Sequence, residues 1–379
     1  MIKVIIYDEA CEILNMEDFL KEEVEVVSYL KNNREYFSEF IDDIKVCTIK
    51  DFKEDLDSIE FDFIIINSRY SNFIYENLRE LRINPENIID VSFFSYDFMS
   101  GSFKEKLLYC KENSLTDFNT LFIGRNYIKE EVIGEYFNDY INISNRFLDL
   151  HYDYHLLYYL IKNNKINENV RVGIFTNYSM IYENIDLVEG KYEYIKIFED
   201  MFSVHKNVNF NNTYFSLCHE GFKNNFSKLF RDLDFKELRF IDEKNISEDN
   251  EEKIKYDVQT ETINYKESNI VAFKMNKNLI IQILKMLHEN NIQVFFIIPP
   301  VSKYYKTYIN NTLKKEFYMV LNKHMSENIH VFDYFDLDLE DKYFSSPCTL
   351  NEVGSNEFLK SLSYDIKEKF SCVKMCNDL

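Results

Sequence analysis

The sequence predicts an α/β protein, and two observations carry this prediction. Apolar runs of strand length alternate with longer segments of helical period through most of the 379 residues. The composition, 46% hydrophobic and 16% aromatic, provides for a large buried core. We therefore expect two consecutive domains, each a sheet between layers of helices: a small one over residues 1–98 and a larger one over residues 116–370.

Five apolar runs in the first domain are expected to be buried strands. These runs are residues 3–7, 25–30, 45–48, 62–67 and 88–91. Residues 70–81 have helical periodicity, and Pro85 marks a turn before the last strand. Residues 99–115 are expected to connect the domains, with a helix over 102–112.

The α/β alternation restarts in the second domain. Strands are expected at residues 120–124, 140–144, 170–176, 293–298 and 329–334, and helices at 129–137, 150–161, 276–289 and 351–370. The charged, glycine-free stretch 242–267 is expected to be an excursion or lid outside the core. Residues 371–379 are expected to form a tail.

The charge balance excludes several classes of partner. With 44 Lys and Arg against 65 Asp and Glu, the formal charge is −21, whereas binding to nucleic acid or anionic lipid relies on Lys and Arg. No segment approaches the roughly 18 to 20 apolar residues of a membrane span, and Asp8 and Glu9 directly follow the short apolar N-terminal run. We expect a cytoplasmic protein that binds no nucleic acid and does not insert into a membrane.

Glycine is scarce, and this scarcity excludes motifs. The seven glycines are Gly101, Gly124, Gly134, Gly173, Gly190, Gly221 and Gly354. Their spacing rules out a standard G-x-G-x-x-G turn, a G-x-S-x-G nucleophile elbow and a G-x-x-x-x-G-K-[ST] phosphate loop. The seven cysteines form no C-x-x-C pair, which favours reduced thiols over disulfides or a zinc site.

Two motifs in the second domain carry a family resemblance. The first is Ile297-Ile298-Pro299-Pro300 followed by Tyr304-Tyr305, and the second is Leu350-Asn351-Glu352-Val353-Gly354 at the start of the last helix. With residues 122–127 (FIGRNY), they resemble the SGNH (GDSL-like) hydrolase superfamily over residues 116–370, in particular the bacterial branch resembling the D-alanine transfer protein of teichoic-acid synthesis. The resemblance implies a three-layer α/β/α domain and binding roles for Gly124, Ser144, Asn145 and Asn351. Residues 1–98 resemble a degenerate Rossmann-type domain in which Asp8-Glu9-Ala10 replaces the glycine turn.

The chain departs from this superfamily at the catalytic positions. In the superfamily a Ser attacks a carbonyl, a His takes its proton, and an Asp three residues before the His orients it. The corresponding positions hold Asn126, Thr349 and Ser346. An amide is no hydroxyl nucleophile, and a threonine hydroxyl cannot act as a base at neutral pH. The resemblance therefore implies a non-catalytic or altered-activity binding protein in surface glycan or polymer modification, which takes a small molecule, glycan precursor or protein partner and no cofactor.

Two alternatives stay open. The chain could be an active carbohydrate esterase or O-acyltransferase whose catalytic residues have moved to Cys348, His151, His155 or Ser346, so whether it is an enzyme is undecided. A catalytic cysteine would need a neighbouring histidine or helix N-terminus to lower its pKa. His151 and His155 share a helix face and could ligate zinc, but without H-E-x-x-H or a third ligand we expect no metal. The first domain could alternatively bind a nucleotide.

Overall fold

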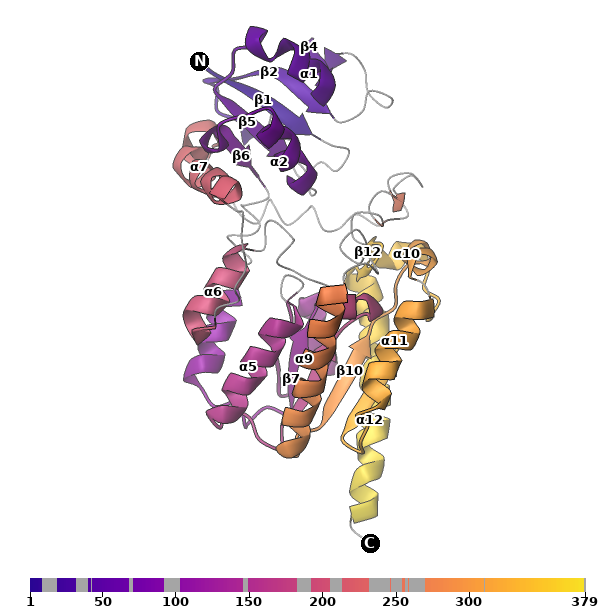
Figure 1. Cartoon of the computed structure of the whole chain (residues 1–379). Coiled ribbons are helices and arrows are strands. Elements are labelled where there is room, and N and C mark those ends of the chain that lie inside the picture. The colour runs from indigo at the N-terminus through magenta and orange to yellow at the C-terminus, as the bar shows by residue number, and fades with distance from the viewer. Residues whose placement is uncertain are drawn as a thin grey trace. The chain divides into compact units, whose positions relative to one another are not determined.

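A computed structural model describes most of the chain. The described residues are 1–8, 19–31, 40–41, 43–67, 71–91, 103–145, 149–182, 192–204, 213–231, 246, 254–255, 258, 270–309 and 311–377. The chain divides into two compact units, and both have helices around a parallel sheet, which confirms the α/β class (Figure 1). The excursion expected at 242–267 lies, except for 246, 254–255 and 258, outside the described residues.

The two units are not consecutive segments of sequence. Unit 1 comprises Met1–Gly101, Val188–Glu193 and Lys206–Ile241. Unit 2 comprises Ser102–Leu187, Tyr194–His205 and Asp242–Leu379. This differs from the expected division, in which residues 1–98 formed the first domain by themselves.

The sheet of unit 1 contains all five expected strands. They are β1 (Ile2–Asp8), β2 (Val24–Lys31), β4 (Ile44–Thr48), β5 (Phe63–Asn67) and β6 (Ile88–Asp90). They are parallel, in the order β4-β2-β1-β5-β6, and the short β3 (Phe40–Ile41) pairs antiparallel with β4 at the edge. Numbered along the chain, the parallel strands follow the order 3-2-1-4-5 of doubly wound sheets. Buried residues run without interruption from Val4 to Tyr7, as expected for a strand covered on both faces.

The helices of unit 1 include one from a distant part of the sequence. They are α1 (Ile49–Asp55), α2 (Ser71–Glu80) and α7 (Thr213–Leu229), with short 3₁₀ turns η2 (Leu56–Ser58) and η3 (Pro85–Asn87). The α7 residues Cys218 and Phe222 belong to the same buried core as Ile88 of β6 (Figure 1). Gly221 permits this approach, because a Cβ there would lie 2.6 Å from the Glu86 carbonyl oxygen.

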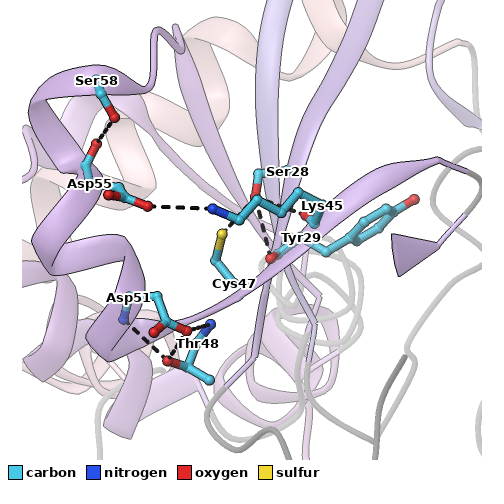
Figure 2. A network of polar contacts seen from close by, with 8 residues as sticks. All are labelled: Ser28, Tyr29, Lys45, Cys47, Thr48, Asp51, Asp55 and Ser58. Carbon is cyan, nitrogen blue, oxygen red and sulfur yellow. Dashed lines mark hydrogen bonds and ion pairs between the residues drawn. The ribbon is translucent and has the colours of Figure 1, made fainter. Parts of the chain in front are cut away.

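Side-chain hydrogen bonds fix the start of α1 and the β2–β4 pair (Figure 2). The Thr48 hydroxyl accepts the Asp51 N–H at 3.2 Å, and the Asp51 carboxylate accepts the Thr48 N–H at 3.1 Å, which forms a capping box. Ser28 on β2 donates its hydroxyl to the Lys45 carbonyl of β4 at 3.1 Å. Lys45 in turn pairs with Asp55 at 3.4 Å, so polar contacts tie the strand pair to the helix (Figure 2).

Unit 2 contains a five-stranded parallel sheet. Its strands are β7 (Thr120–Gly124), β8 (Tyr140–Asn142), β9 (Arg171–Phe175), β10 (Val294–Ile298) and β11 (Ile329–Asp333). Their order is β8-β7-β9-β10-β11, or 2-1-3-4-5 along the chain, which is the second common order of doubly wound sheets. The strand order reverses between β7 and β9, and in such sheets ligands bind beyond the carboxyl ends of the strands at this switch point.

Helices cover both faces of the unit 2 sheet (Figure 1). They are a helix over 103–112, α4 (Ile133–Tyr136), α5 (Leu150–Lys162), α6 (Tyr192–Phe202), α9 (Ile270–Glu289), α10 (Lys303–Tyr308), α11 (Asn311–Asn322) and α12 (Glu352–Asn377). On one face, Phe122 and Phe295 share a core with Phe358 of α12, and Gly173 leaves room for the two strand rings. On the other face α11 contributes Phe317, whose ring centroid lies 6.2 Å from that of Phe296. The last helix runs to Asn377, so residues 371–377 continue it and do not form the separate tail that we expected.

Candidate functional site

Buried polar side chains gather at the carboxyl ends of β7, β8 and β9. We use the name switch-point cluster for Gly124, Arg125, Tyr127, Asn142, Asp153 and Asn177. All six residues are at least nine-tenths buried. Buried polar groups require hydrogen-bond partners, and in this fold the switch point is where ligands are bound. The cluster is therefore the candidate site of unit 2.

Gly124 ends β7 with a backbone that only glycine adopts without strain. Its φ is +86°, and a Cβ would lie 2.2 Å from the Phe175 carbonyl oxygen. The same carbonyl accepts the Arg125 N–H at 2.9 Å, and the Gly124 carbonyl accepts the Asn145 N–H at 2.8 Å. Gly124 therefore has a structural role, because it turns the chain out of the sheet at the end of β7, which lies between β8 and β9.

Asp153 reaches the Gly124 turn from helix α5. Its Oδ1 accepts the Gly124 N–H at 3.1 Å, and the residue is 7% exposed. Burial raises the pKa of the Asp153 carboxyl to about 7; the nearby Asp149 adds to the rise, whereas the Gly124 hydrogen bond and Arg125 oppose it. An acid that titrates near neutrality at a switch point is a candidate functional group. Sequence reasoning did not select Asp153, and the only sequence signal was a carboxylate within an aromatic helix.

Tyr127 joins the end of β7 to the end of β9. Its hydroxyl accepts hydrogen bonds from Asn177 Nδ2 at 2.7 Å and from Arg125 Nη1 at 3.4 Å. The Asn177 Oδ1 in turn accepts from the Ser179 hydroxyl at 2.6 Å and the Met180 N–H at 3.0 Å. The Arg125 guanidinium and the side chains of Tyr127 and Asn177 thus form one buried hydrogen-bond network at the point where the strand order reverses.

Asn142 and Ser144 form a second polar pair, after β8. The Asn142 Oδ1 accepts both the N–H and the hydroxyl of Ser144, at 3.1 and 2.6 Å. The Asn142 Nδ2 is buried and has no hydrogen-bond partner in the part of the chain that the structure describes. The binding roles of Ser144 and Asn145 stay predictions.

The segments that carry the SGNH resemblance lie side by side. Leu350 N–H donates to the Tyr127 carbonyl at 2.9 Å, and Ser302 N–H donates to the Pro347 carbonyl at 3.0 Å. Lys129 N–H donates to the Ser355 hydroxyl at 2.9 Å. The loop after β7, the turn after β10 and the start of α12 therefore meet, although the sequence separates them widely.

The positions of the superfamily triad have local structural roles. Asn126 Oδ1 accepts the Ile128 N–H at 3.0 Å and so closes an Asx turn. Ser346 pairs with Thr349 in the hairpin of β12 (Phe344–Ser346) and β13 (Thr349–Leu350). Between them, the buried Cys348 Sγ lies 3.9 Å from the Thr349 hydroxyl. The hydrogen bond from Leu350 to Tyr127 brings this hairpin beside the segment that contains Asn126.

Asn351 holds the start of α12. Its Oδ1 accepts the Gly354 N–H at 2.9 Å, and its Nδ2 donates to the Lys342 carbonyl at 2.6 Å. Its predicted binding role remains untested, but the structure engages both ends of its side-chain amide within the fold.

His151 and His155 lie on one face of α5, with ring centroids 4.5 Å apart. Each is two residues from Asp153, or about 200° around the helix, so the imidazoles lie on the side away from the switch-point cluster. Burial lowers the pKa of His155. Among the described residues, no group of three or more His, Cys, Asp or Glu side chains is placed to hold a metal ion.

No protein-family model matches the chain, and no curated protein sequence matches it significantly. In the described part of the chain, no helix is both long and apolar enough to cross a bilayer.

Proposed function

We propose that unit 2 is a ligand-binding domain on an SGNH-like scaffold that does not use the Ser–His chemistry of that superfamily. The observation that carries the proposal is the meeting of three distant segments, after β7, after β10 and before α12, next to the switch-point cluster. Doubly wound sheets bind their ligands at this edge. The resemblance supplies the ligand class, a small molecule or glycan precursor of surface-polymer modification.

The side chains of the cluster are suited to orient a polar ligand. Arg125, Asn142 and Asn177 offer hydrogen-bond donors, and Asp153 offers an acceptor. Small-molecule sites typically combine a few such fixed polar groups with apolar surroundings, and the cluster lies above a core rich in phenylalanine. Donors and acceptors together match a polyhydroxyl or acylated sugar.

Hydrolysis by the superfamily mechanism is disfavoured by the residues at its reactive positions. The amide of Asn126 is engaged in a turn, and Thr349 provides a hydroxyl where the mechanism needs an imidazole. Cys348 is the one thiol of the hairpin, and its Sγ faces that hydroxyl at 3.9 Å. A thiol has to be ionised by a neighbouring base or positive charge before it acts as a strong nucleophile.

Two measurements on the whole chain test the proposal. With p-nitrophenyl acetate we expect no hydrolysis above the rate of a Cys348→Ala, His151→Ala double variant. With ¹⁵N-glycine-labelled protein, we expect N-acetylglucosamine or its uridine diphosphate ester to shift the Gly124 amide resonance saturably. Asn177→Ala should weaken this binding at least tenfold, while the matched control Asn163→Ala, at the exposed far end of α5, should not.

Other outcomes overturn the proposal in different ways. Turnover that falls more than tenfold in the double variant would establish the alternative, an esterase or acyltransferase with relocated residues. If the uridine diphosphate ester shifts only the Gly221 amide resonance, the nucleotide binds to unit 1 instead. The absence of any saturable shift would contradict binding of this ligand class.

A further inference from the structure

The contact between Asp153 and Gly124 joins a titratable side chain to a backbone turn. The Gly124 N–H has the carboxylate of Asp153 as its acceptor at 3.1 Å, whereas the carbonyl of Gly124 and the N–H of Arg125 bond to backbone on either side. The turn carries Arg125, Asn126 and Tyr127 beyond the sheet. The Asp153 side chain thus holds the N–H of Gly124, at the point where β7 ends and the loop over residues 125–127 begins.

The surroundings of Asp153 are buried and carry few charges. Asp149 lies one turn earlier at the N-cap of α5, where its Oδ1 accepts the His151 N–H at 2.9 Å, and Arg125 comes from the loop after β7. The residues that follow β9, Thr176 and Asn177, are buried and uncharged. Helix α9 packs on α5, and its buried polar residue Asn276 is also uncharged. The histidines of this part of α5, His151 and His155, lie on its opposite face.

We propose that Asp153 is a proton-controlled positioning residue. Its ionised carboxylate holds the Gly124 N–H and fixes the turn that presents Arg125, Asn126 and Tyr127, and protonation weakens that hold. This inference deepens the proposed function, since the turn borders the proposed ligand site, but the proton effect itself does not require a ligand.

The physical basis is the difference between a charged and a neutral acceptor. A hydrogen bond to a carboxylate is roughly twice as strong as one to a neutral group. Burial raises the pKa of Asp153 to about 7, so the carboxyl is protonated below this value and ionised above it. The turn is therefore held more firmly at pH 8 than at pH 6.

The scarcity of glycine makes a direct test possible. Labelling with ¹⁵N-glycine and ¹³C-carbonyl isoleucine selects only Ile-Gly pairs, of which the chain has two, Ile123-Gly124 and Ile133-Gly134. A Gly134→Ala variant removes the second signal and assigns the first. A Cβ at Gly134 would lie no closer than 3.3 Å to its nearest neighbour, the Tyr140 hydroxyl, which makes this variant mild.

The titration has a defined expected result. Between pH 5 and 9 the Gly124 amide shifts should move with a midpoint near 7, while those of Gly134 stay flat. Asp153→Asn, which keeps an amide oxygen able to accept the N–H, should abolish the midpoint. Asp149→Asn should keep the titration but lower its midpoint, because Asp149 raises the pKa of Asp153.

The inference is overturned if Gly124 does not titrate, or if its titration survives in Asp153→Asn. Should that variant fail to fold, the native titration and the direction of the Asp149→Asn shift still decide the matter. Since these signals are recorded without ligand, failure to find a glycan ligand would contradict the proposed function alone, and a flat Gly124 signal would contradict this inference alone.

Discussion

Gly124 combines a left-handed backbone with a neighbouring carbonyl that leaves no space for a side chain. Gly134 lies in the helix α4, and a Cβ there would lie 3.3 Å from the Tyr140 hydroxyl, which is the end of a side chain that can shift by a few tenths of an ångström. The two glycines therefore form a matched pair, in which one is required by the fold and the other is not.

Gly124→Ala should destabilise unit 2 by about 2 kcal/mol or more, since a positive φ costs a non-glycine residue about 1 to 3 kcal/mol and the Phe175 carbonyl must also move. Gly134→Ala should change stability little or raise it slightly, because alanine favours helix. Urea unfolding of both variants measures the difference. Equal stabilities would show that the β7 turn is less constrained than its geometry indicates.

At single residues, sequence patterns located the frame but not the titrating group. Gly124 and Gly354 stood out from the sequence because glycines are few and fall in the motifs. Asp153 did not, because its pKa depends on burial and on the N–H of Gly124, a residue 29 positions away. Nothing local to Asp153 in the sequence reports either quantity.

Among the elements, α12 depends on its first turn. Gly354 can approach the Tyr343 carbonyl only without a side chain, since a Cβ would lie 2.2 Å from it, and Asn351 caps the N–H of Gly354. The start of the helix is thereby fixed against the hairpin that holds Cys348 and Thr349.

Asn351→Ala should cost about 1 to 2 kcal/mol, because it removes the cap on Gly354 and the donor to the Lys342 carbonyl. The exposed Glu357→Ala on the same helix serves as control and should have little effect. Thermal unfolding followed by circular dichroism compares them. If both variants melt at the native temperature, the Asn351 hydrogen bonds do not stabilise the start of α12 as expected.

Apolar runs were sufficient to locate the main strands, but not the strands of two residues. The buried runs around Val4, Ile65 and Phe296 are strands as predicted, because a continuous apolar run bounded by polar residues suits a parallel strand buried on both faces. The two-residue strands β3 and β13 carry no such run. Their pairing partners, rather than their own residues, determine that they are strands.

Across the whole molecule, unit 1 is completed by a returning segment. The core that contains β1, β5 and β6 also takes in Cys218, Phe222 and Leu229 of α7. Burial of a large side chain such as Phe222 or Leu229 contributes roughly 1.5 to 3 kcal/mol to the free energy of unfolding. Unit 1 without α7 should therefore lose much of its stability.

A fragment Met1–Gly101 should accordingly bind a separate peptide Lys206–Ile241, gain helix content and melt at least about 5 °C higher than the fragment alone. The same peptide with Gly221→Val should bind more weakly, because its side chain would meet the Glu86 carbonyl. Calorimetry and circular dichroism supply the readout. A fragment that folds fully and ignores the peptide would show that α7 is dispensable.

The sequence by itself determined the α/β class, the acidic charge, the positions of the longer strands and those of several helices, because these follow from composition and local periodicity. It did not locate α6, α7 or α11. The tertiary structure decided the two strand orders, the docking of α7 on unit 1 and the setting of Asp153. These depend on contacts between residues far apart in the chain. The spacing of apolar residues reports which face of an element is buried, but not which distant segment buries it.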